Sequence, residues 1–216
     1  MVVYMTTELF AAFIAFAFVA SVTPGPNNLM LMASGANFGV LRTLPHLLGV
    51  SGGFTLMIAL IGLGFTRLFE AFPASLVILK FASVAYLLYL AWRVATAAPA
   101  PSSVHNGASA GEGEATQAQP LNFWQAAAFQ WVNPKAWAMA ITAIGAYTQP
   151  EKLLLSVAFV ALVFGAVNLP TITLWMTAGA QLRRFLSSPL RLRVFNIVAG
   201  VLLAATAAPI MFAGKV

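Results

Sequence analysis

Long runs of apolar residues, separated by shorter polar segments, set the pattern of this chain. A helix of about 20 residues crosses a hydrocarbon core of about 30 Å, so each run of that length predicts a membrane-spanning helix. The pattern contains six such runs: Leu9 to Ala36, Pro45 to Phe65, Phe72 to Trp92, Asn122 to Tyr147, Leu153 to Gly179 and Val194 to Phe212. We therefore expect an all-α polytopic membrane protein with six transmembrane helices.

Polar proline motifs interrupt the first and the fourth run. These motifs are TPGPNN (Thr23 to Asn28) and VNPKAW (Val132 to Trp137). At about 1.5 Å per helical residue, each motif lies about 20 Å into its run and so close to the middle of the bilayer. Proline removes a backbone donor and clashes with the preceding turn, so both helices should be broken there. Because unpaired backbone is costly in lipid, such breaks should be buried against protein or line an aqueous cavity.

The two broken runs divide the chain into related halves. Residues 1–95 and 121–216 each hold three runs, and the flexible linker 96–120 between them is rich in small residues and proline. The third runs of both halves also have related sequences, ASVAYLLYLA and IVAGVLLAAT. Three spans are an odd number, so the second half should enter the membrane from the opposite side. This predicts one membrane domain made of two inverted three-helix repeats, with the two breaks meeting near the axis between them.

Composition agrees with a lipid environment and excludes several functions. The chain is 61% hydrophobic and 7% charged, with a mean hydropathy of +0.89, whereas soluble domains carry about 25% charged residues. Its net charge of +6 is scattered between apolar runs, so we expect no nucleic-acid partner. There is no cysteine, and His46 and His105 are far apart in sequence, so we expect no metal site. Enzyme motifs such as HExxH or an intramembrane aspartate pair are missing, so an enzyme is not expected.

Basic residues at the ends of the runs predict the orientation. One side of the membrane collects six arginines and the other collects four basic residues, and the richer side is expected to be cytoplasmic. The two sets are Arg42, Arg93, Arg183, Arg184, Arg191 and Arg193 against Arg67, Lys80, Lys152 and Lys215. The linker 96–120 should then be cytoplasmic and both termini outside, in a bacterial-type cytoplasmic (inner) membrane.

The breaks also supply chemistry suited to a zwitterion. Helices that restart near Asn27 and Lys135 expose N–H groups and a partial positive charge, which attract a carboxylate. Carbonyls freed before Pro24 and Pro26 should accept hydrogen bonds from an ammonium group. A lysine in mid-membrane costs about 2.5–3.5 kcal/mol and marks a functional site. The alternative is a packing kink capped by Asn27, with a lysine that fills vacant carbonyls or snorkels.

These motifs carry a family resemblance. TPGPNN together with FWQAAAFQWVNPKAW (Phe123 to Trp137) resembles the LysE/RhtB family of amino-acid exporters, and AAFQWVN is similar to its cysteine and O-acetylserine exporter branch. The resemblance covers nearly the whole chain except the linker. It implies efflux of an amino acid or derivative, driven by the proton gradient, without a bound cofactor. The site residues that it implies are Pro24, Gly25, Pro26, Asn27, Asn133, Pro134 and Lys135.

The chain departs from this family at the position after PGP, where many relatives have aspartate and this chain has Asn27. All five acidic residues lie at span ends or in loops, so no intramembrane carboxylate is available to carry a proton. The remaining candidates for proton coupling are His46, Lys135 and Glu8.

Three further polar or aromatic residues are candidates for the substrate site. Asn28 belongs to the first motif, Trp137 ends the second, one turn into the new helix, and Asn168 stands near Pro170 in the fifth run. For Asn168, hydrogen bonding between helices is an equal alternative. A channel, or a structural membrane protein with packing kinks, is the alternative function, and a homodimer is left open.

Overall fold

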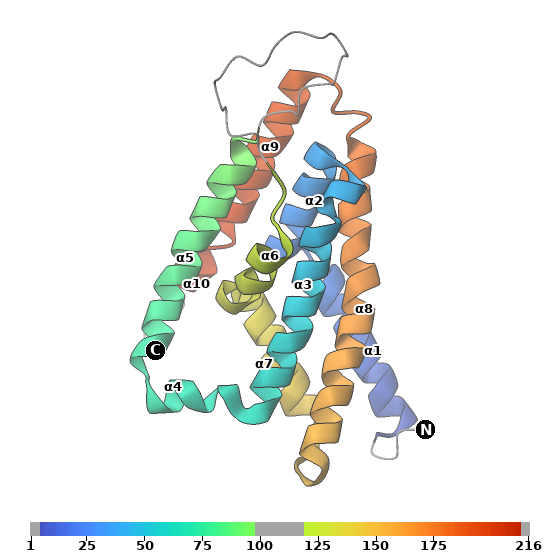
Figure 1. Ribbon diagram of the computed structural model, residues 1–216, viewed down its shortest axis with the longest axis vertical. Helices are drawn as coiled ribbons and strands as arrows, with labels where there is room; N and C mark the ends of the chain where they lie inside the picture. The colour runs from blue at the N-terminus through green and yellow to red at the C-terminus, as the bar shows by residue number, and fades with distance from the viewer. Residues whose placement is uncertain (1–4, 98–118, 213–216) are drawn as a thin grey trace.

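The computed structural model describes residues 5–97 and 119–212, and every regular element in these ranges is helical (Figure 1). The all-α prediction is therefore confirmed for the described residues, while most of the linker 96–120 lies outside them. The helices are α1 (Thr7–Val22), α2 (Pro26–Phe38), α3 (Val40–Leu60), η1 (Ile61–Phe65), α4 (Arg67–Ala71), α5 (Ala74–Ala95), α6 (Phe123–Phe129), η2 (Gln130–Val132), α7 (Pro134–Tyr147), η3 (Pro150–Lys152), α8 (Leu153–Leu182), α9 (Pro189–Ala205) and α10 (Ala208–Phe212).

Four helical segments of the described chain are long and apolar enough to cross a membrane, and a fifth is obtained if α1 and α2 count as one broken span. The four are Val40–Phe65, Ala74–Ala95, Pro150–Leu182 and Pro189–Met211, and the α1–α2 pair is bent by 56° at its break. The fourth expected span, Asn122 to Tyr147, is not among them because it consists of the short elements α6, η2 and α7. The protein is thus a multi-pass membrane protein, and the six-helix inverted repeat stays a prediction.

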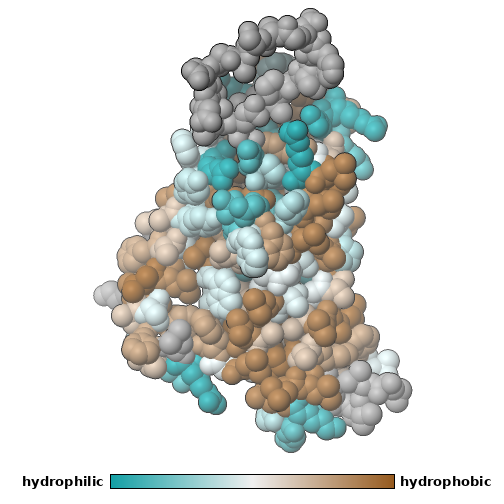
Figure 2. Space-filling model, in the orientation of Figure 1, coloured by the Kyte–Doolittle hydropathy of each residue, from teal (hydrophilic) through white to brown (hydrophobic). Residues whose placement is uncertain are grey.

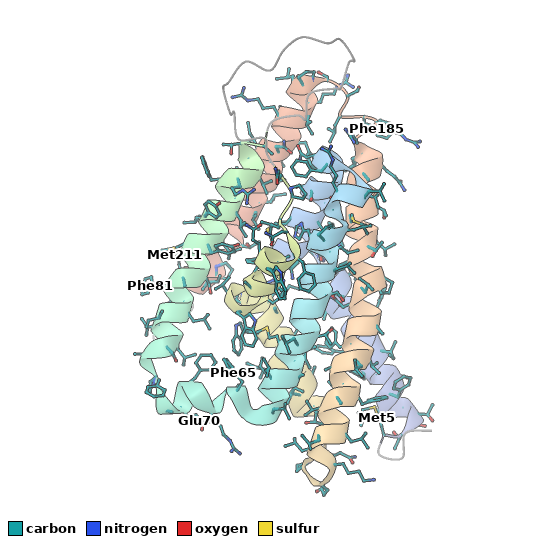
Figure 3. The ribbon with its side chains drawn as sticks, viewed as in Figure 1. Met5, Phe65, Glu70, Phe81, Phe185 and Met211 are labelled. Carbon is teal, nitrogen blue, oxygen red and sulfur yellow. The ribbon has the colours of Figure 1, made fainter. Side chains whose placement is uncertain are left out.

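The surface has the layering that a bilayer requires. Figure 2 shows an apolar belt around the middle of the molecule and hydrophilic residues toward both ends. Phe185, beside the arginine-rich turn after α8, lies at the upper end, while Met5 and Glu70 lie at the lower end (Figure 3). The end of α5 and the start of α9 also lie at the upper end, whereas α1 begins at the lower end (Figure 1).

Close packing of α2 against α8 depends on two glycines. A Cβ added at Gly35 would collide with the carbonyl oxygen of Met176, and one added at Gly179 would collide with the carbonyl oxygen of Met32. Backbones can approach this closely only where the side chain is a hydrogen, which is the common device of membrane helix pairs. This contact fixes the height of α2 against α8.

Glycines also let α3 approach α6, and a polar pair joins α2 to α9. Gly49 and Gly53 face the backbone of Phe123 and Ala127. Asn37 and Asn196, both buried, exchange hydrogen bonds of 2.7 and 2.9 Å between their side-chain amides. These contacts hold α2 against α8 and α9, and α6 against α3.

Candidate functional site

The first break separates α1 from α2 by three residues. Helix α1 ends at Val22, and α2 begins at Pro26, where the missing N–H and fixed φ of proline suit the first helical position. Gly25 is the N-cap residue, with an extended φ of −169°, and it makes no side-chain hydrogen bond to the helix. The N-terminus of α2 is therefore not closed by a capping side chain.

The second break has a different local structure. A short 3-10 turn, Gln130–Val132, precedes Asn133, and α7 begins at Pro134. The Asn133 side-chain oxygen accepts a hydrogen bond of 3.1 Å from the backbone N–H of Lys135. Because this cap occupies the start of α7, the N-terminus of α2 is the more open of the two for an anion.

The two breaks lie against each other. Asn27 Nδ2 donates to Gln130 Oε1 at 2.8 Å, and Gln130 Nε2 donates to Asn27 Oδ1 at 3.3 Å. Lys135 reaches from α7 across the first break and donates from Nζ to the carbonyl oxygen of Thr23. Segments more than 100 residues apart in sequence thus form one polar centre.

Side chains already bond to the carbonyls at the end of α1. Asn28 Nδ2 donates to the carbonyls of Ser21 and Thr23 at 2.8 and 2.9 Å, and Trp175 Nε1 donates to the Val22 carbonyl at 3.2 Å. Each of these carbonyls therefore accepts a protein donor in the structure, and the binding of a substrate ammonium group to them stays a prediction.

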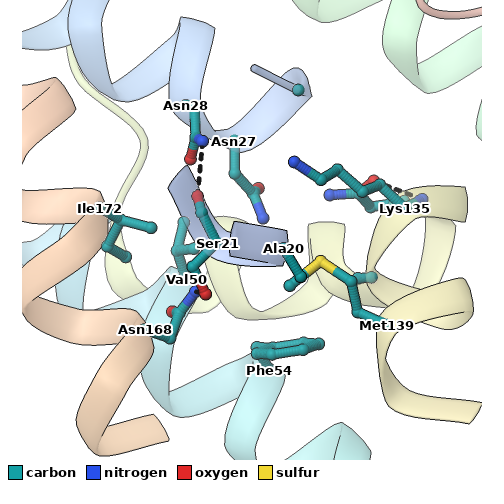
Figure 4. Close-up of a pocket in the computed structure, with 13 residues that line it drawn as sticks. Ala20, Ser21, Asn27, Asn28, Val50, Phe54, Lys135, Met139, Asn168 and Ile172 are labelled. Atoms are coloured by element: carbon teal, nitrogen blue, oxygen red, sulfur yellow. Dashed lines mark hydrogen bonds between the residues drawn. The ribbon is translucent and has the colours of Figure 1, made fainter. Parts of the chain in front are cut away.

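A cavity of about 20 Å³ lies at the meeting point of the breaks (Figure 4). Its polar side comes from the end of α1, the two motifs and α8, and its apolar side comes from α1, α3, α7 and α8. Its lining residues are Ala20, Ser21, Gly25, Asn27, Asn28, Val50, Phe54, Asn133, Lys135, Ala136, Met139, Asn168 and Ile172. This lining contains one cation and no acidic side chain.

Six of the ten expected substrate-site residues line this cavity: Gly25, Asn27, Asn28, Asn133, Lys135 and Asn168. The three prolines of the motifs, Pro24, Pro26 and Pro134, shape the breaks without contributing to the lining. Trp137 also lies outside it. Its indole N–H donates to the Trp131 carbonyl at 2.9 Å, and its ring packs against Phe65, Phe69 and Trp131.

Asn168 joins α8 to the end of α1. Its Nδ2 donates to the Ser21 hydroxyl at 3.0 Å, and its side chain is 4% exposed. Its Oδ1 is buried and accepts no hydrogen bond from the described residues. Such an orphaned acceptor is costly in an apolar setting, so Asn168 offers the cavity an unused acceptor.

The three candidates for proton coupling fall in different places. Lys135 lines the cavity, whereas Glu8 is exposed in the first turn of α1, far along the helix from the break. His46 is buried on α3, one turn before the cavity residue Val50, and neither ring nitrogen has a hydrogen-bond partner among the described residues. The structure thus brings one of the three into the cavity.

Sequence reasoning missed residues that build this centre, among them Ser21, whose hydroxyl accepts from Asn168. Gln130, fully buried, holds Asn27, and Trp175 bonds to the end of α1. Gln130 is a polar residue in an apolar run three positions before Asn133, and that signal could have identified it. Trp175 lies in an apolar run where nothing in the sequence marks it.

Comparison with known proteins agrees with this architecture. The family model described as LysE type translocator matches residues 18–214. This chain belongs to the LysE family. It is similar to the cysteine/O-acetylserine efflux proteins of Escherichia coli (strain K12), Escherichia coli O9:H4 (strain HS) and Shigella sonnei (strain Ss046). Each is 30% identical over 210 residues, which is 96% of this chain and 100% of the relative.

No solved structure matches the chain. Since LysE-family proteins are translocators, this LysE-family chain is a transporter rather than an enzyme. In secondary transporters, substrate sites are commonly built from broken helices that meet within the membrane.

Proposed function

We propose that the protein exports a small neutral amino acid or amino-acid derivative from the cytoplasm, of the class named in its relatives, cysteine and O-acetylserine. The observation that carries this proposal is the cavity where two broken segments meet, lined by one lysine and no acidic side chain. Discontinuous membrane helices that meet in this way are typical of secondary transporters.

Lys135 and the start of α2 form the carboxylate end of the proposed site. The lysine supplies a full positive charge, and the uncapped N-terminus of α2 supplies a partial one. A second cationic group on the substrate, as in lysine or arginine, would meet no acidic partner in this lining. The charge distribution therefore favours substrates with a neutral side chain.

The ammonium end of the proposed site lies at the end of α1. The Thr23 carbonyl and the orphaned Asn168 Oδ1 are acceptors on the opposite side of the break from the α2 N-terminus. Beside them, Val50, Phe54, Met139 and Ile172 give the cavity an apolar wall that suits a small side chain.

The proposed driving force is the proton gradient across a bacterial-type inner membrane. The linker 96–120 and the arginine-rich turn after α8 are proposed to face the cytoplasm. His46 is the proposed proton carrier outside the cavity, since its buried imidazole has no hydrogen-bond partner among the described residues and lies one turn from Val50.

Transport by purified protein in liposomes tests this function. Labelled amino acids and O-acetylserine would be screened with and without a pH gradient, and empty liposomes would give the background. A carrier gives saturable flux that increases when unlabelled substrate is present on the far side. Flux that does not saturate would support the channel alternative instead, and absence of flux for every amino acid would refute the proposal.

A further inference from the structure

The position of Lys135 on the Thr23 carbonyl is not explained by the needs of the backbone. Asn28 already donates to the Thr23 carbonyl at 2.9 Å, so this acceptor would be paired without the lysine. The ammonium of Lys135, a half-buried residue, fills the second lone pair of this carbonyl, and its desolvation is a cost that pairing the carbonyl once does not require.

The first break is shaped to let this lysine pass. A Cβ added at Gly25 would lie 2.7 Å from Lys135 Cδ and 3.2 Å from Nζ. The backbone of Gly25 is extended, with φ −169°, a conformation open to any residue. A side chain at this position would therefore displace the lysine side chain rather than strain the backbone.

The Lys135 ammonium bonds to the Thr23 carbonyl in the way that the α-ammonium group of an amino acid would. Three carbonyls at the end of α1 accept side-chain donors from Asn28, Trp175 and Lys135, and the lysine alone among these donors is a cation. It comes from α7, across the contact between the two breaks, on a long flexible stem. A primary ammonium on a carbonyl at a helix end is also the arrangement that a bound amino acid would form.

The size of the cavity points in the same direction. A cavity of about 20 Å³ has room for roughly one water molecule. Lys135 takes up part of the space at the break, as Figure 4 shows it reaching from α7 toward Asn27. Withdrawal of the lysine would open both the space and the Thr23 carbonyl.

We infer that Lys135 is a tethered occupant of the substrate's ammonium subsite. In the empty transporter its ammonium lies on the Thr23 carbonyl. The carboxylate of an arriving amino acid draws the lysine away, and the substrate's own ammonium takes its place on that carbonyl. The site thus selects molecules that carry both groups, because an amine alone cannot displace the lysine and a carboxylate alone leaves the subsite empty. This inference rests on the proposed function.

Three small thiols that differ by one group each provide the test: L-cysteine, cysteamine, which lacks the carboxylate, and 3-mercaptopropionate, which lacks the ammonium. Binding to purified protein would be measured calorimetrically under reducing conditions, and the chain has no cysteine with which the ligands could react. Lys135→Met and Lys135→Gln remove the ammonium group from the Thr23 carbonyl. Two variants are used so that the result does not depend on the folding of one. Lys152→Met, at an exposed lysine in η3, is the control.

Wild-type protein and the Lys152→Met control should bind L-cysteine and neither analogue. Both Lys135 variants should bind cysteamine at least about tenfold more tightly than wild type, and L-cysteine about tenfold more weakly, because one charge-assisted hydrogen bond is gained or lost. Loss of cysteine binding without any gain for cysteamine would overturn the inference and leave Lys135 as a carboxylate partner only. Wild-type protein that binds no amino acid would overturn the proposed function and this inference with it.

Discussion

Asn27 and Gln130, which are 103 positions apart, exchange two hydrogen bonds between their side-chain amides, at 2.8 and 3.3 Å. Gln130 also donates to the Ala126 carbonyl at 2.8 Å, so its amide is held by its own helix while it holds the first break. This pair fixes the α2 N-terminus beside the side chain of Lys135. The geometry of the cavity thus depends on a residue that does not line it.

Replacing Gln130 should therefore loosen the site. Gln130→Leu leaves the Asn27 amide without its partner, and we expect the free energy of unfolding to fall by about 1–3 kcal/mol. Thermal unfolding of purified protein measures this, and the KM for export should rise. Gln181→Leu, at an exposed glutamine near the end of α8, is the matched control. An unchanged melting temperature for Gln130→Leu would contradict the role of this pair.

Removing the cavity's cation should remove export. Lys135→Ala is expected to abolish nearly all transport at unchanged membrane abundance, because it deletes the one charged side chain in the lining. Lys135→Arg should be partly active at best, since a planar fork does not replace a compact ammonium. Export in vesicles and immunoblotting of membranes measure these effects, with Lys152→Ala as control. Full export by Lys135→Ala would show that this lysine is structural and would support the alternative that the first motif is a packing kink.

A methyl group at Gly25 should disturb the lysine and leave the backbone unstrained. Gly25→Ala would place its Cβ 2.7 Å from Lys135 Cδ, and we expect the KM to rise about tenfold with little change in melting temperature. Gly145→Ala in α7 is the control, because nothing lies within 4 Å of its added Cβ. A Gly25→Ala protein with the kinetics of wild type would show that Lys135 does not need this passage.

Substitution of His46 should separate proton coupling from substrate recognition. His46→Leu replaces a buried imidazole that lacks hydrogen-bond partners among the described residues, so the folded protein should be no less stable than wild type. We expect exchange of labelled for unlabelled substrate to continue, and transport driven by a pH gradient to be lost. Measuring both fluxes in the same liposomes tests this. Gradient-driven transport at the wild-type rate would exclude His46 as the proton carrier.

Reporter fusions test the orientation. Fusions at Ser109 and at Ser187 should report the cytoplasm, and a fusion after Val216 should report the outside, because the arginine-rich ends are expected to be cytoplasmic. A fusion at Ser109 that reports the periplasm would mean that either the span count or the assigned orientation is wrong.

Local rules explain why much of the site could be predicted from the sequence. Proline limits its own φ and removes a donor whatever surrounds it, so both breaks could be located from the motifs alone. Polar residues within such breaks are kept out of lipid, which is why Asn28, Asn133 and Lys135 were expected near a cavity and line one. The all-helical class followed from the lengths of the apolar runs.

Features that depend on distant partners could not be predicted in this way. Trp137 was expected at the site, but its indole N–H finds the Trp131 carbonyl and its ring joins an aromatic cluster. The run from Asn122 to Tyr147 was expected to be one span broken at its proline motif, and α7 does begin at Pro134. The 3-10 turn Gln130–Val132 that ends α6, and the resulting helices of 7 and 14 residues, were not expected. Both outcomes depend on which donors and acceptors meet in three dimensions.

The glycine contact between α2 and α8 limits how this sequence can vary. Gly35 is nine residues beyond Pro26, about 14 Å along the helix from the break. A single methyl group at Gly35 or Gly179 would push one backbone away from the other and carry Asn28 with it. Substitutions are therefore not tolerated at these two positions, although neither lines the cavity. A mutational scan should find them as intolerant as the residues of the cavity.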